Sequence, residues 1–161
     1  MNTERAQGFA PFIAPDSRLL VLGSFPSVKS RAQGFYYGNP QNRFWRTVCG
    51  FFGEEVPADI AGKKAFLLRR QIALWDVVTA CEIAGSADAS IRGEQLADVA
   101  ALLAGSAVEA VFCNGKTAYA LLQRGASLPV RTECLPSTSP ANPRFRAAVW
   151  EDRLRSVFGD T

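Results

Sequence analysis

The chain alternates short apolar runs with segments in which apolar residues recur at helical spacing. The first run covers residues 18–22 and is followed at once by Gly23, and neither its length nor its flanks suggest a helix. Similar runs cover residues 72–75, 108–113 and 130–135. Strands that alternate with helices form parallel β-α-β units, so the pattern predicts a three-layer α/β/α sandwich with a mostly parallel central sheet. We expect one domain spanning residues 1–161.

Segments of helical spacing fill the intervals between these runs. The expected helices cover residues 42–52, 59–70, 96–103 and 116–124. Asn142-Pro143 is typical of a helix start, because an asparagine cap precedes proline at the first helical position, and it predicts a last helix that ends near Phe158. Residues 1–15 mix charge, glycine and proline, so we expect a loosely packed N-terminal segment there.

Composition excludes several kinds of chemistry. The chain has no histidine, which removes the commonest metal ligand and general base at neutral pH and excludes Ser-His and Cys-His catalysis. Its four cysteines, at positions 49, 81, 113 and 134, form no C-x-x-C pair. We therefore expect reduced thiols that pack as small hydrophobic side chains, with no metal and no cofactor.

Charge and hydropathy limit the partners. The net charge of +3 and the pI near 8.8 suit an anionic partner that is bound through a local patch. No stretch of the sequence is both long enough and free enough of charge to cross a bilayer. We therefore expect a soluble cytoplasmic protein with no membrane partner.

Four unusual loops follow the predicted strands, at residues 23–42, 76–93, 114–116 and 136–142. Ligands of parallel α/β sheets bind beyond the carboxyl ends of strands, where these loops lie. In the first loop, three consecutive aromatic residues, Phe35 to Tyr37, stand between glycines and favour a stacking site for a nucleobase. Anchoring of the loop in the core is the alternative for these rings, and a plain helix cap is the alternative for Asn42.

Two stretches of this loop, Gly23–Ser27 and Gly38–Trp45, resemble the first motif of the uracil-DNA glycosylase superfamily, and more narrowly that of its hypoxanthine-DNA glycosylase group. Leu135–Asn142 resembles the second motif, which is the loop that enters the DNA minor groove. Asn114-Gly115-Lys116 resembles a segment of the thymine-DNA glycosylases. The similarity covers nearly the whole chain, in the order found in the family.

Three positions depart from the family pattern. Asn39 stands where the hypoxanthine group has histidine, and Phe25 stands where most members carry a water-activating aspartate or asparagine. Leu135 replaces a histidine that supports the departing base in uracil-specific members. The resemblance to the hypoxanthine group assigns the positioning of water to the side-chain oxygen of Asn42. An amide suffices for this task, because positive charge on the sugar makes positioning of the water more important than its deprotonation.

The resemblance also implies roles for other side chains. Asp76 stands where uracil-specific relatives present an asparagine to the base edge, and an ionised carboxylate there would accept the N1–H of hypoxanthine. A structural or helix-capping aspartate is the alternative. Tyr37 aligns with the stacking phenylalanine of mismatch-specific relatives, and Phe35 is the second candidate for the stacking ring. The other candidates for contact with the base are Phe25 and Asn39. The candidates for contact with the DNA backbone and groove are Gly23, Ser24, Ser27, Lys29, Lys116, Ser137, Thr138, Ser139, Pro140 and Arg144.

The resemblance implies a monofunctional DNA glycosylase for a deaminated base, with hypoxanthine the preferred candidate. Such an enzyme extrudes the nucleotide from double-stranded DNA and leaves an abasic site without strand cleavage. A uracil or thymine mismatch glycosylase and a catalytically weak module that binds damaged DNA are alternatives with the same fold. A protein that binds a phosphorylated metabolite is a fourth reading, which leaves residues 136–142 unexplained. We expect a monomer, because base flipping needs no second subunit.

Overall fold

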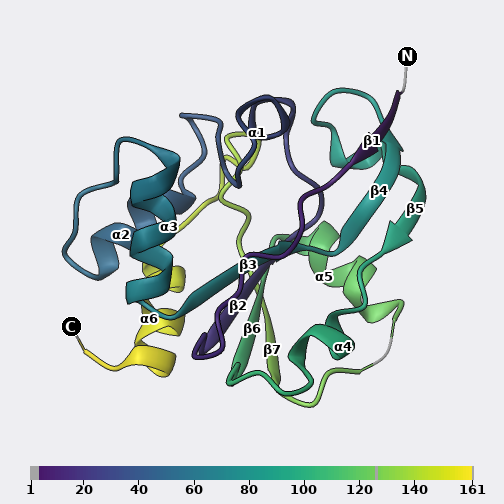
Figure 1. The fold of residues 1–161 in the computed structure, drawn as a ribbon. Coiled ribbons are helices and arrows are strands. Elements are labelled where there is room, and N and C mark those ends of the chain that lie inside the picture. Colours follow the sequence, from purple (N-terminus) through teal and green to yellow (C-terminus); the bar gives the residue numbers. More distant parts are fainter. Residues whose placement is uncertain (1–3, 126, 161) are drawn as a thin grey trace.

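The computed structural model describes residues 4–125 and 127–160 (Figure 1). Its central sheet has the strand order β3-β2-β6-β7, and all four strands are parallel. The four strands predicted from the apolar runs are therefore confirmed. Their bounds are Leu19–Gly23 for β2, Ile72–Asp76 for β3, Ala110–Asn114 for β6 and Arg131–Leu135 for β7.

Helices cover both faces of this sheet. Every residue of β2 is buried, and its alternate side chains enter different cores. Leu19 and Val21 pack with the first helical layer, whereas Leu20 and Leu22 pack with the second. Figure 1 shows α2 (Phe44–Phe51), α3 (Ile60–Arg69) and α6 (Ala147–Phe158) on one side of the sheet, and α4 (Val99–Leu103) and α5 (Lys116–Gln123) on the other. The predicted three-layer α/β/α sandwich is confirmed.

A second, antiparallel sheet has the order β1-β4-β5. Its strands are β1 (Glu4–Gln7), β4 (Val78–Ile83) and β5 (Arg92–Leu96). Their inner side chains form a small core of their own, which includes Phe25. Two predictions are therefore wrong. Residues 76–93 contain β4 and the start of β5 rather than one loop, and Glu4–Gln7 of the N-terminal segment are paired with β4 rather than loosely packed.

Two predicted helices begin later in the structure than in the sequence analysis. The helix expected over 96–103 is helical only from Val99, because Leu96 ends β5. The last helix begins at Ala147 rather than at Asn142-Pro143. The cap residue of α6 is Arg146, and Asn142 instead holds a turn, in which its Oδ1 accepts a hydrogen bond from the Arg144 N–H and its carbonyl accepts one from Arg43. The remaining short helices are α1 (Val28–Gln33) and the 3-10 turn η1 (Asp88–Ser90).

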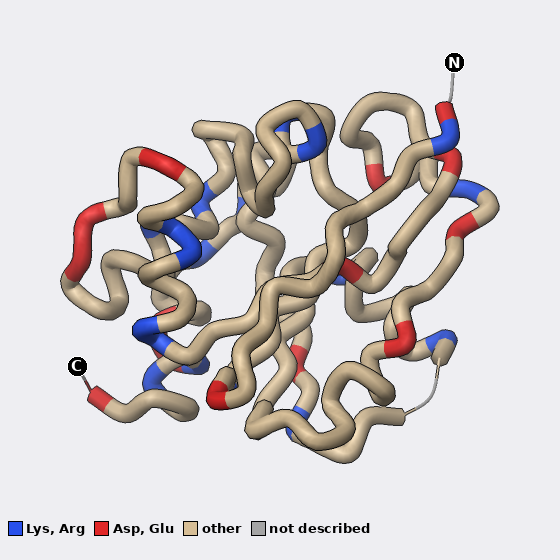
Figure 2. Tube along the Cα trace, in the orientation of Figure 1, with Lys and Arg blue, Asp and Glu red and all other residues tan. Residues whose placement is uncertain are grey.

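The cysteines and the charged residues are spread over the fold. Three cysteines are buried as expected, whereas Cys134, on the edge strand β7, is exposed. Figure 2 shows Lys and Arg distributed over both helical layers and the small sheet rather than collected on one element. Within residues 4–125 and 127–160, no helix has the length and apolar character needed to cross a membrane.

Candidate active site

A pocket with a volume of about 620 Å³ opens at the carboxyl edge of the central sheet. This volume lies in the range typical of small-molecule sites. The loops after β2 and β7, the end of β3 and the turn at η1 supply its walls. The predicted site residues that line the pocket are Gly23, Ser24, Phe25, Ser27, Tyr37, Asn39, Asn42, Asp76, Ser137, Thr138, Ser139 and Pro140.

A buried polar corner of the pocket is formed at the ends of β2 and β3. Parallel pairing places Gly23, the last residue of β2, beside Asp76, the last residue of β3. A Cβ atom on Gly23 would collide with Asp76 Oδ1 and would lie 3.3 Å from the Tyr37 hydroxyl. Only glycine leaves room here for both polar groups to approach the strand.

The Asp76 side chain is buried without a full set of partners. The residue is 4% exposed, and its Oδ2 accepts no hydrogen bond from any described residue. Burial raises the pKa of Asp76 to about 8, and the negative charge of Asp88 adds to the rise. A pKa in this range favours the protonated carboxyl group at neutral pH, in contrast to the ionised carboxylate expected from the sequence. A protonated carboxyl group can donate one hydrogen bond as well as accept.

Tyr37 brings an aromatic face and a hydroxyl to the same corner. Its ring lies nearly parallel to that of Phe44, with centroids 4.2 Å apart and planes 19° apart. Its backbone is left-handed, with φ of 55°, a conformation that costs a bulky residue about 1–3 kcal/mol. Burial raises the pKa of the Tyr37 hydroxyl, and the charge of Asp76 adds to the rise while Asn114 opposes it. The phenol is therefore neutral at physiological pH.

Phe35 does not reach the pocket. Its side chain is buried in the main core, stacked on Trp45 and in edge contact with Phe12 and Tyr36. The reserve stacking role predicted for Phe35 is therefore wrong, and the alternative of core anchoring applies to it. Phe25 lines the pocket and also packs in the small-sheet core, with Arg31 over its ring.

Asn42 stands at the junction of the first loop and α2. Its Oδ1 accepts a hydrogen bond of 2.9 Å from the Phe44 N–H. Arg43, the cap residue of α2, makes no hydrogen bond through its side chain to the first turn of the helix. Asn42, the residue before it, binds the first N–H of α2 instead. One lone pair of the amide oxygen stays available to a ligand in the pocket. Asn39 also lines the pocket, and its Oδ1 accepts from the Gln41 N–H.

Asn114 and Arg43 hold the loop after β7 against the pocket, although the sequence analysis gave neither a role. Asn114 donates from Nδ2 to Thr138 Oγ1 and accepts the Thr138 N–H, both at 2.9 Å. The Arg43 guanidinium donates to the carbonyls of Thr138, Ser139 and Asn142. Both residues lie within the quoted motifs, which was the only signal available for them.

Asp88 is a further pocket residue that the sequence analysis missed. Its Oδ1 accepts a hydrogen bond of 2.8 Å from the Ser24 hydroxyl. Burial of the carboxyl group raises the pKa of Asp88, and the bond from Ser24 opposes the rise. Asp88 lies in a small, polar segment with no motif, so nothing in the sequence pointed to it.

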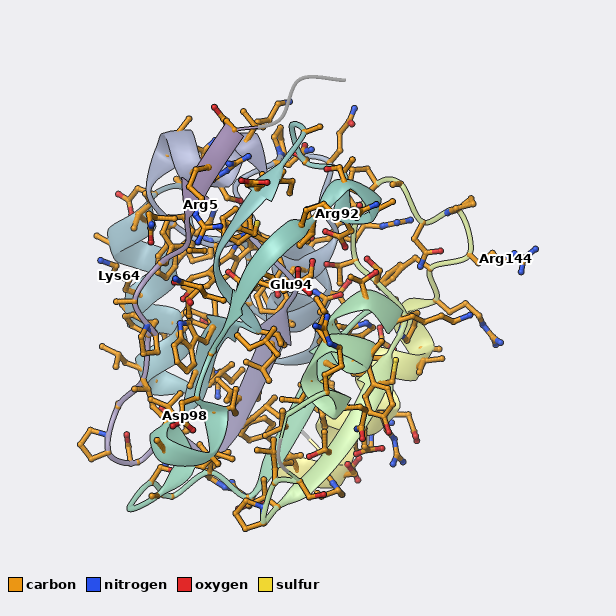
Figure 3. All side chains as sticks on the ribbon, turned by 90° about the vertical axis from the view of Figure 1, so that its right-hand side faces the viewer. Arg5, Lys64, Arg92, Glu94, Asp98 and Arg144 are labelled. Atoms are coloured by element: carbon orange, nitrogen blue, oxygen red, sulfur yellow. The ribbon has the colours of Figure 1, made fainter. Side chains whose placement is uncertain are left out.

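The predicted backbone-binding residues divide into two sets. Ser27 lines the pocket, but its hydroxyl is used within α1, where it accepts the Ser30 N–H and donates to Ser30 Oγ. Lys29, Lys116 and Arg144 are exposed and lie outside the pocket lining. Figure 3 shows the Arg144 side chain extending away from the body of the protein. Among the described residues, no group of three or more Cys, Asp or Glu side chains is arranged to hold a metal ion.

Residues 10–154 match the family described as the uracil DNA glycosylase superfamily. The chain belongs to this superfamily.

Two individual proteins are similar to this chain over most of its length. A hypoxanthine DNA glycosylase of Methanosarcina acetivorans is 38% identical over 157 residues, which cover 92% of this chain and 98% of the relative. A hypoxanthine DNA glycosylase of Methanosarcina barkeri is 32% identical over 156 residues, with coverage of 94% and 99%. The resemblance predicted from the sequence is confirmed, and so is the predicted class of enzyme, a DNA glycosylase.

A solved structure shares the fold. The solution NMR structure of a Methanosarcina acetivorans protein, provisionally assigned as a uracil DNA glycosylase, has a TM-score of 0.82 and 35% identity to this chain. The match covers 96% of this chain and 99% of that protein. The uracil DNA glycosylase-like architecture therefore extends over nearly the entire chain.

The departures from the superfamily pattern have distinct places in the structure. Phe25 and Asn39 both line the pocket. Leu135, at the end of β7, is 3% exposed and packs in the main core instead. A leaving base in this pocket would therefore meet one apolar ring and one amide at the altered first-motif positions, and no side chain from position 135.

Proposed function

We propose that this chain is a monofunctional DNA glycosylase that removes hypoxanthine from double-stranded DNA. The observation that carries the proposal is one pocket lined by Asn42, Tyr37 and Asp76, which offer an amide, an aromatic ring and a hydrogen-bonding carboxyl group. The two Methanosarcina relatives named hypoxanthine DNA glycosylase, which align over nearly their full length, support the choice of base.

The base enters the pocket after the nucleotide is extruded from the duplex. Extrusion costs a few kcal/mol and is easiest at mispaired bases. Ser139 and Pro140, at the tip of the loop after β7, fill the space that the base leaves. The extruded base stacks on Tyr37, whose other face is supported by Phe44, and its edge meets Asp76. Phe25 and Asn39 close the sides of the pocket.

Hydrolysis breaks the bond between C1′ of the sugar and the ring nitrogen of the base. The electron pair of this bond leaves with the base, and the oxygen of a water molecule forms the new bond to C1′. One water proton passes to the solvent, and the base takes up a proton. Asn42 holds the water through the free lone pair of its Oδ1, while the other lone pair binds the Phe44 N–H. This fixed orientation lowers the entropic part of the barrier.

Contacts to the DNA backbone come from the pocket rim and from exposed cations. The backbone at Gly23 and Ser24 and the loop from Ser137 to Pro140 supply the rim. Lys29, Lys116 and Arg144 are exposed and free to meet phosphates. Because the set is small, we expect a modest dependence of binding on salt. The protein acts as a monomer in this proposal.

The test uses duplex oligonucleotides that contain hypoxanthine, uracil or mismatched thymine, with alkali treatment to reveal abasic sites. Wild type is expected to act best on hypoxanthine and to leave strands intact before alkali. Asn42→Ala should lower the rate of base release by about 100-fold or more. Asn42→Asp is the matched control, because it keeps an oxygen both for the Phe44 N–H and for the water.

Each alternative function predicts a different outcome. Faster release of uracil or thymine than of hypoxanthine would make the chain a mismatch glycosylase. Tight binding to these duplexes without any release would make it a module that binds damaged DNA. Full activity of Asn42→Ala would remove the water-positioning role from Asn42.

A further inference from the structure

Two carboxyl groups of unequal environment meet at the pocket. Asp76 ends β3 and is buried, with Oδ2 lacking any hydrogen-bond partner within the described chain. Asp88, in η1, is an exposed residue. Its Oδ1 accepts a hydrogen bond of 2.8 Å from the Ser24 hydroxyl. Neither takes part in an ion pair found between described residues.

No positive charge from residues 4–125 or 127–160 compensates the burial of Asp76. The titratable groups that act on it are Asp88 from η1 and the Tyr36 and Tyr37 hydroxyls from the first loop. The Tyr37 hydroxyl is itself buried and makes no hydrogen bond with another described residue. The Asp76 carboxyl group and the Tyr37 hydroxyl thus both lie beside Gly23 in the lining of the pocket.

We propose that Asp76 recognises the extruded base as an uncharged carboxylic acid, and that Asp88, held by Ser24, is the positioning residue that keeps it uncharged. The recognised feature is a lactam edge, in which an N–H stands next to a carbonyl. One carboxyl oxygen of Asp76 accepts the N–H, and the protonated oxygen donates to the carbonyl. The inference rests on the proposed function and specifies its substrate as a base with a lactam edge, which hypoxanthine and uracil share.

The uncharged form matters because of where negative charge develops. When the bond to C1′ breaks, the electron pair that leaves with the base is delocalised onto its carbonyl oxygen. A donor at that oxygen forms a stronger hydrogen bond in the transition state than in the ground state, whereas an ionised carboxylate would repel it. Asp76 would thereby supply the support that histidine gives in relatives, since this chain has no histidine.

The order of ionisation follows from the two environments. The Ser24 hydroxyl donates to Asp88 and opposes the rise of its pKa, and Asp88 is a more exposed residue than Asp76, so Asp88 carries the first negative charge. That charge, together with burial, raises the pKa of Asp76 to about 8. Replacing Asp88 with asparagine keeps an acceptor for Ser24 and removes only the charge. The pKa of Asp76 should then fall.

The test is the pH dependence of single-turnover release of hypoxanthine from a duplex. Wild type should lose activity as the pH rises through about 8. Asp76→Asn should stay active and lose this part of the alkaline decline, because an amide also donates and accepts but does not ionise. Asp76→Ala should be inactive or nearly so. The lactam N–H itself ionises in alkali, so the difference between wild type and Asp76→Asn isolates the carboxyl group.

Asp88→Asn should move the midpoint of the decline to lower pH by roughly half a unit or more. Glu55→Gln is the matched control, because it removes one carboxylate from an exposed position outside the pocket, and it should leave the midpoint unchanged. A wild-type rate that increases through pH 8, or Asp76→Asn as inactive as Asp76→Ala, would overturn the role of Asp76. An unmoved midpoint in Asp88→Asn would overturn the role of Asp88.

A carboxyl ¹³C NMR titration of the free protein separates this inference from the proposed function. Asp76 should titrate near pH 8 in wild type and at lower pH in Asp88→Asn. Titration of Asp76 near pH 4 would overturn the inference even if hypoxanthine is released. Absence of base release by wild type at every pH would overturn the proposed function, and the lactam inference with it.

Discussion

The Asn114 side chain forms two hydrogen bonds with Thr138, one to its hydroxyl and one from its backbone N–H, both 2.9 Å long. Asn114 ends β6, and Thr138 lies in the loop after β7 and is 1% exposed. This pair sets the height of the loop above the sheet edge. The position of Ser139 and Pro140 at the pocket rim therefore depends on an amide that ends a neighbouring strand.

Asn114→Ala should lower the free energy of unfolding by about 1–3 kcal/mol, because it leaves the buried Thr138 N–H and hydroxyl without their partner. Urea unfolding measures the change. Thr138→Val, which removes only the hydroxyl, should cost less than Asn114→Ala. Equal stability of Asn114→Ala and wild type would show that the loop does not depend on this pair.

Arg43→Ala should loosen the same loop from its other side. The guanidinium donates to three carbonyls of the loop and lies over the Phe145 ring at 4.6 Å. Loss of these charge-assisted bonds should cost about 2 kcal/mol and should speed amide hydrogen exchange in residues 137–142. Arg46→Ala, an exposed change in the same helix, is the control. Unchanged exchange rates in Arg43→Ala would contradict the prediction.

Gly23→Ala should reduce base release by at least about tenfold, because its Cβ would displace the Asp76 carboxyl group. Single-turnover kinetics measure the loss. Gly50→Ala is the matched control, since its Cβ meets no atom within 4 Å and alanine favours the helix by up to about 1 kcal/mol. Wild-type kinetics in Gly23→Ala would mean that the position of Asp76 is not critical.

Asp76→Asn should stabilise the protein increasingly as the pH rises. The pKa of Asp76 is about 8 in the folded state, against an ordinary value of 3.8. Between these two pH values the folded protein keeps a proton on Asp76 that the unfolded chain has lost. The contribution of Asp76 to stability is therefore fully present below about pH 4 and declines until about pH 8.

Urea unfolding at pH 5 and pH 9 checks this linkage. The advantage of Asp76→Asn over wild type should be larger at pH 9 by at least about 2 kcal/mol. Glu55→Gln, at an exposed carboxylate, should show no such change. A difference between Asp76→Asn and wild type that is the same at both pH values would show that Asp76 is ionised throughout.

The sequence predicted the central sheet well but not the small one. The runs at β2, β3, β6 and β7 are local and apolar, and the parallel fold follows from their alternation with helices. In contrast, β4 is specified by pairing with β1, which joins Glu4 to Ile83 across most of the first half of the chain. No local pattern encodes such a partner. The helix start at Asn142-Pro143 failed for a similar reason, because Arg43 binds the Asn142 carbonyl.

The site was predictable where a motif named its residues. Asn42 and Tyr37 come from the loop after β2 and Asp76 from the end of β3, and all three line one pocket, as expected for neighbouring strand ends. Phe35 was predicted to line the pocket because it stands next to the other aromatic residues in the sequence, but its ring is buried in the core against Trp45. Neither Asp88 nor the protonation of Asp76 could be read from residue types, because both depend on burial and on charge brought together by the fold.

The most direct measurement is the quantity of free hypoxanthine released from a duplex oligonucleotide by wild type, by Asn42→Ala and by Asn42→Asp, followed by mass spectrometry. We expect release by wild type with the DNA strand intact, at least about 100-fold slower release by Asn42→Ala, and retained release by Asn42→Asp. No free hypoxanthine from wild type, or equal rates for wild type and Asn42→Ala, would contradict it.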